Sequence, residues 1–219
     1  GVTDSLPGTS QPLIVSRDEQ DSNSLTMNAR LKVSQTGKKI NVIWGAVPGA
    51  DGYDVYVQYC GKKYTARSVN AIKNAKKTKA SIKKVNGKAL NLKKKYKIYV
   101  LAYKLADGKK VTLAKSITAY IAGRNNKTYT NAKAVKVKKS VYKLKKGKTA
   151  RISADTVLAE KGKRQLTGVH AKEFRYASDD KKVAVVSAKG KIKAVGKGKC
   201  SVYVYARNGC AKKIKVTVR

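Results

Sequence analysis

From Ala29 onward, apolar and polar residues alternate with a period of two, the pattern of half-buried β-strands. The apolar positions of the clearest runs in the first half are Ile40, Val42, Trp44, Tyr53, Val55, Val57, Tyr96, Ile98, Val100 and Ala102. Turn signals such as Asn86-Gly87 and Asp107-Gly108 separate the runs. No apolar stripe of helical period extends over a dozen residues. We therefore predict an all-β chain of short antiparallel strands.

The last strand pair illustrates how the alternation fixes register. Asn208-Gly209 is a strong hairpin signal. A three-residue loop, residues 207–209, keeps both apolar faces inward and pairs Ala206 with Cys210 and Cys200 with Val216. The alternative, a two-residue turn, sets inward Val204 opposite Lys213, against the alternation of Ile214, Val216 and Val218. In both registers the two cysteines lie about 20 Å apart, so we expect thiols rather than a disulfide.

Composition shifts divide the chain. Residues 1–28 are polar, hold two of the three prolines and show no sustained period, so we predict a linker or a partly ordered segment that ends in a strand. The polar break after Gly123 separates two complete strand sets. We predict two immunoglobulin-like antiparallel β-sandwiches in tandem, over residues 29–123 and 124–219.

The first predicted domain resembles a fibronectin type III domain. Trp44 ends the second strand and is followed by the loop Ala46–Tyr53. The stretch Leu90–Ala102 places Tyr96 where that family has its tyrosine corner. The resemblance implies that Trp44 and Tyr96 are structural, with the Tyr96 hydroxyl bonded back to the preceding loop.

The second predicted domain resembles the group 2 bacterial immunoglobulin-like domains. Four segments carry this resemblance: Tyr142–Gly147, Tyr176–Val186, Gly190–Gly198 and Cys200–Ala206. Tyr176 stands where the family often has Trp, and its role is expected to be structural. The basic insertion Glu160–Lys172 lengthens a loop that is usually shorter. The Lys-rich tandem resembles surface and cell-wall proteins of anaerobic gut Gram-positive bacteria.

Charge is the unusual property of this sequence. The chain holds 51 Lys+Arg against 12 Asp+Glu, a net charge of +39. Residues 1–30 are slightly acidic, so the rest carries all of the excess. Such a field attracts polyanions, although a merely solvated surface would have the same composition. The candidate polyanion-binding residues are Lys93, Lys94, Lys95, Lys138, Lys139, Lys143, Lys145, Lys146, Lys161, Lys163 and Arg164.

Several tyrosines occupy the outward parity of their strands. They are Tyr56, Tyr99 and Tyr103 in the first domain and Tyr203 and Tyr205 in the second. Exposed tyrosines stack on sugar rings or anchor an interface. The alternative is that cross-strand pairs cover lysine stems and stabilise the sheet.

The residues of a catalytic or metal site are missing from the sequence. His170 is the one histidine, and no second ligand is near it in sequence, so we predict a plain surface or loop-packing residue. The carboxylates are sparse; Asp179 and Asp180 adjoin in a predicted turn and are expected to bond its backbone. The glycines lack the strand-to-helix context of a phosphate loop. We expect no enzyme activity, no cofactor and no metal.

These observations favour a non-catalytic, secreted or cell-surface module for structure or adhesion, with glycans of the cell wall or of a host, or extracellular proteins, as candidate targets. Two alternatives stay open: an electrostatic binder of teichoic acid or glycosaminoglycan, and an accessory region of a larger carbohydrate-active enzyme. We expect a monomeric module, no specific nucleic acid and no membrane insertion. The absence of a starting Met and of a signal peptide is typical of a mature or trimmed form.

Overall fold

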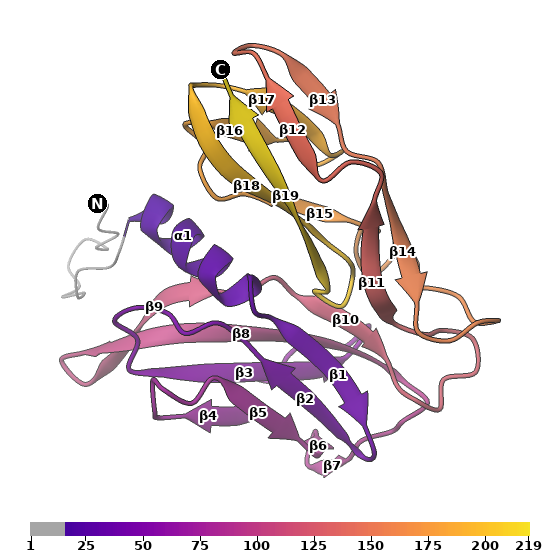
Figure 1. Cartoon of the computed structure of the whole chain (residues 1–219). Helices are drawn as coiled ribbons and strands as arrows, with labels where there is room; N and C mark the ends of the chain where they lie inside the picture. Colours follow the sequence, from indigo (N-terminus) through magenta and orange to yellow (C-terminus); the bar gives the residue numbers. More distant parts are fainter. Residues whose placement is uncertain (1–15) are drawn as a thin grey trace. The chain divides into compact units, whose positions relative to one another are not determined.

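The computed structural model describes residues 16–219, so the first half of the predicted linker lies outside the described residues (Figure 1). The chain forms two compact units. The first comprises the residues up to Ala119 with Gly123–Asn125, and the second comprises Tyr120–Ala122 with Asn126–Arg219. No helix within residues 16–219 is long and apolar enough to cross a membrane.

The first unit contains two main antiparallel sheets and a small hairpin. One sheet has the order β1 (Lys32–Thr36), β2 (Lys39–Ile43), β5 (Lys79–Ile82). The other has the order β10 (Ala119–Ala122), β8 (Lys95–Ala106), β3 (Gly52–Tyr59), β4 (Asn70–Ile72), and β9 (Lys109–Lys115) also pairs with β8. The hairpin consists of β6 (Lys84–Val85) and β7 (Lys88–Ala89), and its turn residue Asn86 has φ 56°.

Burial follows the predicted alternation on β2, β5 and most of β8, whereas on β3 residues of both parities are mostly buried. Trp44 is 1% exposed, and its ring meets the Tyr53 ring edge-on at 5.3 Å between centroids. The buried Tyr53 hydroxyl accepts a hydrogen bond from the Val47 amide at 3.1 Å and donates one to the Ala75 carbonyl at 3.3 Å. Each apolar residue predicted to point inward on β8, from Tyr96 to Ala102, is buried.

The predicted tyrosine corner is confirmed. Tyr96 is fully buried, and its hydroxyl donates to the carbonyl of Asn91, five residues upstream. The amide of Asn91 in turn donates to the hydroxyl of Tyr59 at 2.9 Å. Burial, together with the neighbouring Tyr59, raises the pKa of Tyr96 well above its ordinary value. Two tyrosine hydroxyls therefore fix both backbone groups of Asn91 ahead of β8.

The prediction of a strand before Ala29 is wrong, because residues Arg17–Asn28 form the helix α1. Ser16 caps it by accepting the Glu19 amide at 3.2 Å. The helix packs through its own buried side chains, Met27 and two asparagines. One of these, Asn28, accepts a hydrogen bond from the Ile117 amide at 2.9 Å. A helix that docks through amide side chains has no apolar stripe, so hydrophobic periodicity does not detect it.

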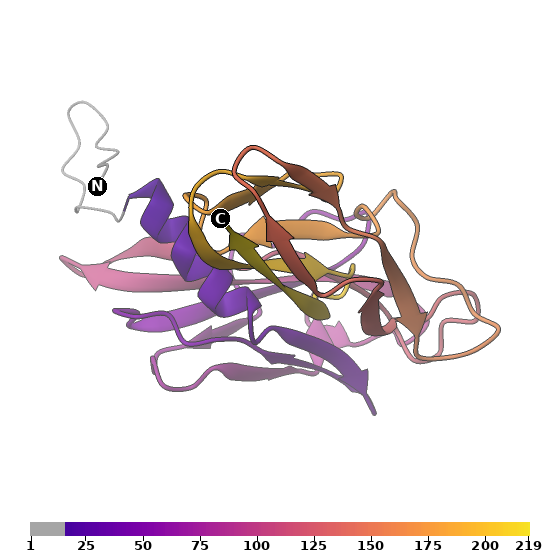
Figure 2. The ribbon, with the colours of Figure 1, turned by 45° about the horizontal axis from the view of Figure 1, so that its top comes forward.

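The second unit has a four-stranded sheet with the order β12 (Val141–Leu144), β19 (Ala211–Val218), β18 (Gly198–Tyr205), β15 (Arg175–Ser178). A three-stranded sheet has the order β13 (Thr149–Arg151), β17 (Lys191–Ala194), β16 (Ala184–Val186), and β11 (Ala132–Val137) pairs with β14 (Ala154–Leu158). All pairs are antiparallel except β12 with β19. Figures 1 and 2 both show β18 and β19 as long neighbouring strands.

The register predicted for the last hairpin is confirmed. Cys200 lies opposite Val216, and the Ala206 amide donates to the Cys210 carbonyl at 2.8 Å. Gly209 has φ 85°, the left-handed conformation that the three-residue loop requires. None of the chain's three cysteines, all within residues 16–219, forms a disulfide. Apart from α1, the all-β prediction is confirmed.

Tyr176 is packed against the core of the second unit, as its structural role requires. Its ring lies over Gly190, where an added Cβ would come within 2.8 Å of the ring. Gly190 also has φ 83°. Glycine is therefore required here both for the turn conformation and for the close approach of the Tyr176 ring.

Candidate functional site

Of the eleven predicted polyanion-binding residues, all at least partly exposed, Lys93, Lys94 and Lys95 belong to the first unit and the other eight to the second. Lys138 and Lys139 follow β11, Lys143 lies on β12, and Lys145 and Lys146 follow it. The residues of the basic insertion, Lys161, Lys163 and Arg164, lie in the loop between β14 and β15. There Lys163 forms an ion pair with Glu160 at 2.7 Å, which neutralises one of the predicted charges.

Two of these lysines, Lys94 and Lys95, line a pocket of about 600 Å³ in the first unit. We call it the hairpin pocket because the β6–β7 hairpin forms one wall, with the end of β3 and the start of β8 completing it. Its lining residues are Tyr59, Cys60, Lys62, Val85, Asn86, Lys88, Ala89, Asn91, Lys94 and Lys95. Lys62 and Lys88 are distant in sequence from the predicted cluster, so sequence reasoning missed them.

The hairpin pocket is held by side-chain amides. Gln58 is 3% exposed and forms a reciprocal pair with Asn86, with bonds of 3.0 and 3.1 Å between their amide groups. Gln58 also donates to the Lys63 carbonyl at 2.9 Å. The Cys60 amide donates to the Lys95 carbonyl at 3.0 Å. Three chain segments are thus fixed around the pocket without the help of a ligand.

The charge in this pocket is entirely positive. Four lysines line it, and none of the described lining residues is acidic. Val85 is buried, while Tyr59 and Cys60 are half-buried. Burial raises the pKa of the Cys60 thiol to about 11, although the nearby ammonium groups of Lys95 and Lys97 lower it. Cys60 is therefore a neutral thiol at physiological pH.

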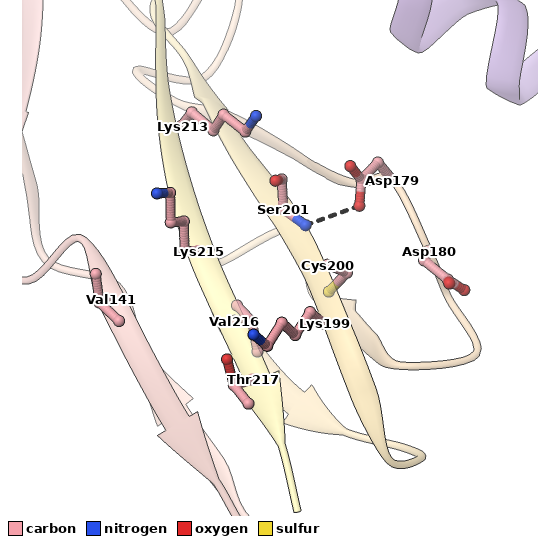
Figure 3. Close-up of a pocket in the computed structure, with 10 residues that line it drawn as sticks. All are labelled: Val141, Asp179, Asp180, Lys199, Cys200, Ser201, Lys213, Lys215, Val216 and Thr217. Atoms are coloured by element: carbon pink, nitrogen blue, oxygen red, sulfur yellow. Dashed lines mark hydrogen bonds between the residues drawn. The ribbon is translucent and has the colours of Figure 1, made fainter.

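A second pocket lies on the outer face of the second unit's four-stranded sheet. This groove of about 640 Å³ is lined by Val141, Asp179, Asp180, Lys199, Cys200, Ser201, Lys213, Lys215, Val216 and Thr217 (Figure 3). Its three lysines were not among the predicted residues, although their alternation with Cys200, Ile214 and Val216 marked them as outward.

Two carboxylates offset the lysines of this groove. Asp179 accepts the Ser201 amide at 2.7 Å, the bond dashed in Figure 3. Asp180 accepts the Lys182 amide at 3.0 Å. The prediction that these aspartates bond the backbone of their own turn is confirmed for Asp180, whereas Asp179 bonds the backbone of β18. The nearly balanced charge of the groove makes it a weaker anion site than the hairpin pocket.

The predicted tyrosine patch exists in part. Tyr56 and Tyr99 stack at 4.8 Å on the outer face of β3 and β8, and Tyr64 meets Tyr99 edge-on at 4.8 Å. The ammonium groups of Lys97 and Lys115 lie 4.4 and 4.2 Å from the Tyr64 and Tyr99 ring centroids. Lysines already lie against these rings, which favours the sheet-stabilising role over sugar stacking.

The expected exposure of two tyrosines is wrong. Tyr103 is 4% exposed because its ring lies against the backbone of Gly52, where an added Cβ would meet its hydroxyl at 2.3 Å. Tyr205 is 1% exposed and stacks on Tyr203 at 6.0 Å, with Arg175 opposite it on β15. Of the second unit's predicted pair, Tyr203 alone remains partly exposed.

Residues 16–219 contain no group of three or more His, Cys, Asp or Glu placed to hold a metal ion. His170 lies in the loop before β15, with its ring edge-on to Tyr120 at 6.0 Å between centroids. This packing is the role predicted for it.

Comparison with solved structures finds distant similarity. Domains 4 and 5 of the S-layer protein SbsC are 15% identical, with a TM-score of 0.34, and the match covers 57% of this chain and 64% of that one. The C-terminal fragment of intimin, solved with the intimin-binding domain of its translocated receptor, is 11% identical, with a TM-score of 0.28 and coverage of 86% and 63%. Domains FN1–FN3 of chicken CNTN1 are 18% identical, with a TM-score of 0.32 and coverage of 87% and 67%.

The match therefore spans less than two thirds of the first two of these structures. A comparison with curated proteins returns no match. The likeness of the first unit to fibronectin type III domains stays a prediction, although its tryptophan and tyrosine corner are in place. Residues 131–218, in the second unit, match the model of the bacterial Ig-like domain (group 2), and the fold is an immunoglobulin-like β-sandwich.

Proposed function

We propose that this chain is a non-catalytic extracellular module of a bacterial surface protein, and that it adheres to anionic polymers through its lysines. The match of residues 131–218 to a bacterial immunoglobulin-like family supports a module of this class. Folds of this class do not define a ligand, so the proposal for the target rests on charge and geometry. The anionic polymers of a Gram-positive cell wall are the target that this location favours.

The charge imbalance is the observation that carries the proposal. With 51 basic and 12 acidic side chains, the basic groups outnumber the acidic groups by 39. The strand alternation places them outward: Lys213 and Lys215 are exposed, while Ile214 and Val216, which alternate with them, are buried. Self-repulsion of this size opposes folding, and a bound polyanion relieves it.

The kind of basic residue indicates the kind of binding. Lysines make up 42 of the 51 basic residues. An ammonium group is a hydrated point charge without the fork by which arginine recognises phosphate. Binding then comes from counterion release and weakens steeply with salt. Neutralising about 6 phosphates costs roughly 10³ in affinity between 50 and 200 mM salt.

The test is retention of the chain on immobilised teichoic acid, heparin and DNA across a salt series. Two chemically modified forms are matched controls, because lysine acetylation removes the charge and reductive methylation keeps it. We expect the native and methylated forms to be retained at about 50 mM salt and the acetylated form to pass through. Passage of the native form through all three columns at that salt would refute polyanion binding.

A further inference from the structure

The hairpin pocket differs from the rest of the basic surface in that four lysines converge on a formed cavity. They come from three segments: Lys62 follows β3, Lys88 lies on β7, and Lys94 and Lys95 lead into β8. Figure 1 shows the β6–β7 hairpin at the lower edge of the first unit. Like charges brought together repel, so their convergence around a cavity with no described acidic lining residue favours an anionic occupant.

The pocket is also larger and less polar than a site for a simple ion. Its volume of about 600 Å³ is in the range of sites for ligands of several rings. Tyr59, Val85 and Ala89 give it apolar surface, and the Tyr59 ring is supported from the core by Tyr96 at 5.3 Å. The carbon–hydrogen faces of a sugar ring fit such a surface, whereas a polyol-phosphate chain has no flat face to place there.

Polar groups for sugar hydroxyls are present and fixed. The Asn91 side-chain oxygen accepts the Lys93 amide at 3.1 Å, which leaves its NH₂ group as the donor end. The Asn86 amide is oriented by its paired bonds to Gln58. Because these groups are already held, binding requires little ordering of the pocket.

We propose that the hairpin pocket binds a short segment of an anionic glycan, with its lysines on carboxylate or sulfate groups and a sugar ring against Tyr59. This inference rests on the proposed polyanion binding and adds a discrete site to it. Binding at such a site depends on where the charges lie, whereas non-specific adhesion depends on how many there are.

The test compares two variants of the full chain with equal net charge. The pocket variant carries Lys62→Gln, Lys88→Gln and Lys94→Gln. The control variant carries Lys38→Gln, Lys73→Gln and Lys109→Gln, three exposed lysines of the same unit that do not line the pocket. The probe is a heparin-derived tetrasaccharide, titrated at about 150 mM salt, where long-range charge effects are screened.

We expect the pocket variant to bind the tetrasaccharide about tenfold more weakly than the control variant, as for the loss of three exposed ion pairs. A second pair, Ala89→Glu against Ala71→Glu, keeps every lysine and adds one negative charge inside or outside the pocket; both alanines are exposed. Loss of binding only with Ala89→Glu supports the site.

Equal weakening by the pocket and control variants overturns the site while leaving polyanion adhesion in place, since both variants would still be retained on heparin at low salt. If the pocket variant, and not the control variant, loses binding of a glycerol-phosphate oligomer but keeps binding of the tetrasaccharide, the choice of an anionic glycan is overturned. Failure of the unmodified chain to bind any polyanion removes both proposals together.

Discussion

The Tyr96 hydroxyl provides the sharpest test of the first unit's architecture. The variant Tyr96→Phe removes one oxygen from a fully buried ring and leaves the Asn91 carbonyl without its donor. An unsatisfied buried group costs about 1–3 kcal/mol, and this partly buried carbonyl belongs in the lower part of that range. We therefore expect the first unit to lose about 1–2 kcal/mol of unfolding free energy. For a domain of roughly 100 residues this lowers the melting temperature by about 4–8 °C per kcal/mol.

Fluorescence of the chain's one tryptophan is a selective assay, because Trp44 is buried in the core of the first unit. Urea unfolding followed at this residue gives the midpoint of that unit alone. Tyr56→Phe is the matched control, since no hydrogen bond of the Tyr56 hydroxyl is found within residues 16–219 and its ring stacks on Tyr99 at the surface. If Tyr96→Phe and Tyr56→Phe unfold at the same midpoint, the corner bond does not stabilise the unit and the reasoning is wrong.

Two further changes test the helix and the pocket thiol. In Gly45→Ala the new Cβ would lie 2.0 Å from the Thr26 carbonyl oxygen, so we expect α1 to shift at a cost of about 1–3 kcal/mol in stability. Amide hydrogen exchange in α1 should then be faster, and unchanged exchange would contradict the contact. Gly168→Ala is the neutral control, because the space around Gly168 is open. With the other two cysteines replaced by serine, alkylation of Cys60 should rise through a pKa of about 11, because burial favours the neutral thiol. The folded chain holds the thiol proton more tightly than the unfolded chain does, so the stability that this proton contributes is complete below about pH 9 and is lost towards pH 11. An alkylation midpoint at or below pH 9 would contradict the burial of the Cys60 thiol.

The strands were predictable because one physical constraint dominates them. On β3 the side chains of Tyr53, Val55 and Val57 share one parity and are all buried. A slip of one residue would move all of them from the core to the opposite face of the sheet, so the sequence specifies the register strongly. The same reasoning selected the three-residue loop of the last hairpin.

The helix could not be predicted in this way because its docking is polar. Asn23 and Asn28 are buried, and Asn23 donates to the Leu113 carbonyl at 3.4 Å. Asparagine is a weak helix former, and its burial leaves no hydrophobic signal. The N-cap at Ser16 with acidic residues in the first turn was the available signal, since this is the local pattern of a helix start.

The pocket was predictable only where the chain brings lysines together locally. Lys94 and Lys95 are adjacent and were selected as part of a run. Their partners Lys62 and Lys88 join them through the tertiary pairing of β3 with β8 and through the Gln58–Asn86 amide pair. Such a contact depends on two polar residues 28 positions apart, and neither hydrophobic periodicity nor charge runs report on it.

The two proposals share a physical origin in the alternation itself. In a sandwich the inward positions decide folding, and the outward positions are free to carry any solvated side chain. A fold of this kind can therefore accumulate lysine without loss of its core, as β19 shows: Ile214, Val216 and Val218 are buried, and Lys213 and Lys215 on the opposite parity are exposed. Net charge of this size weakens the compact state, so folding alone gives no reason for it. Under the proposed function, an anionic polymer outside the chain would supply one, and the fixed lysines of the hairpin pocket would turn that general attraction into recognition.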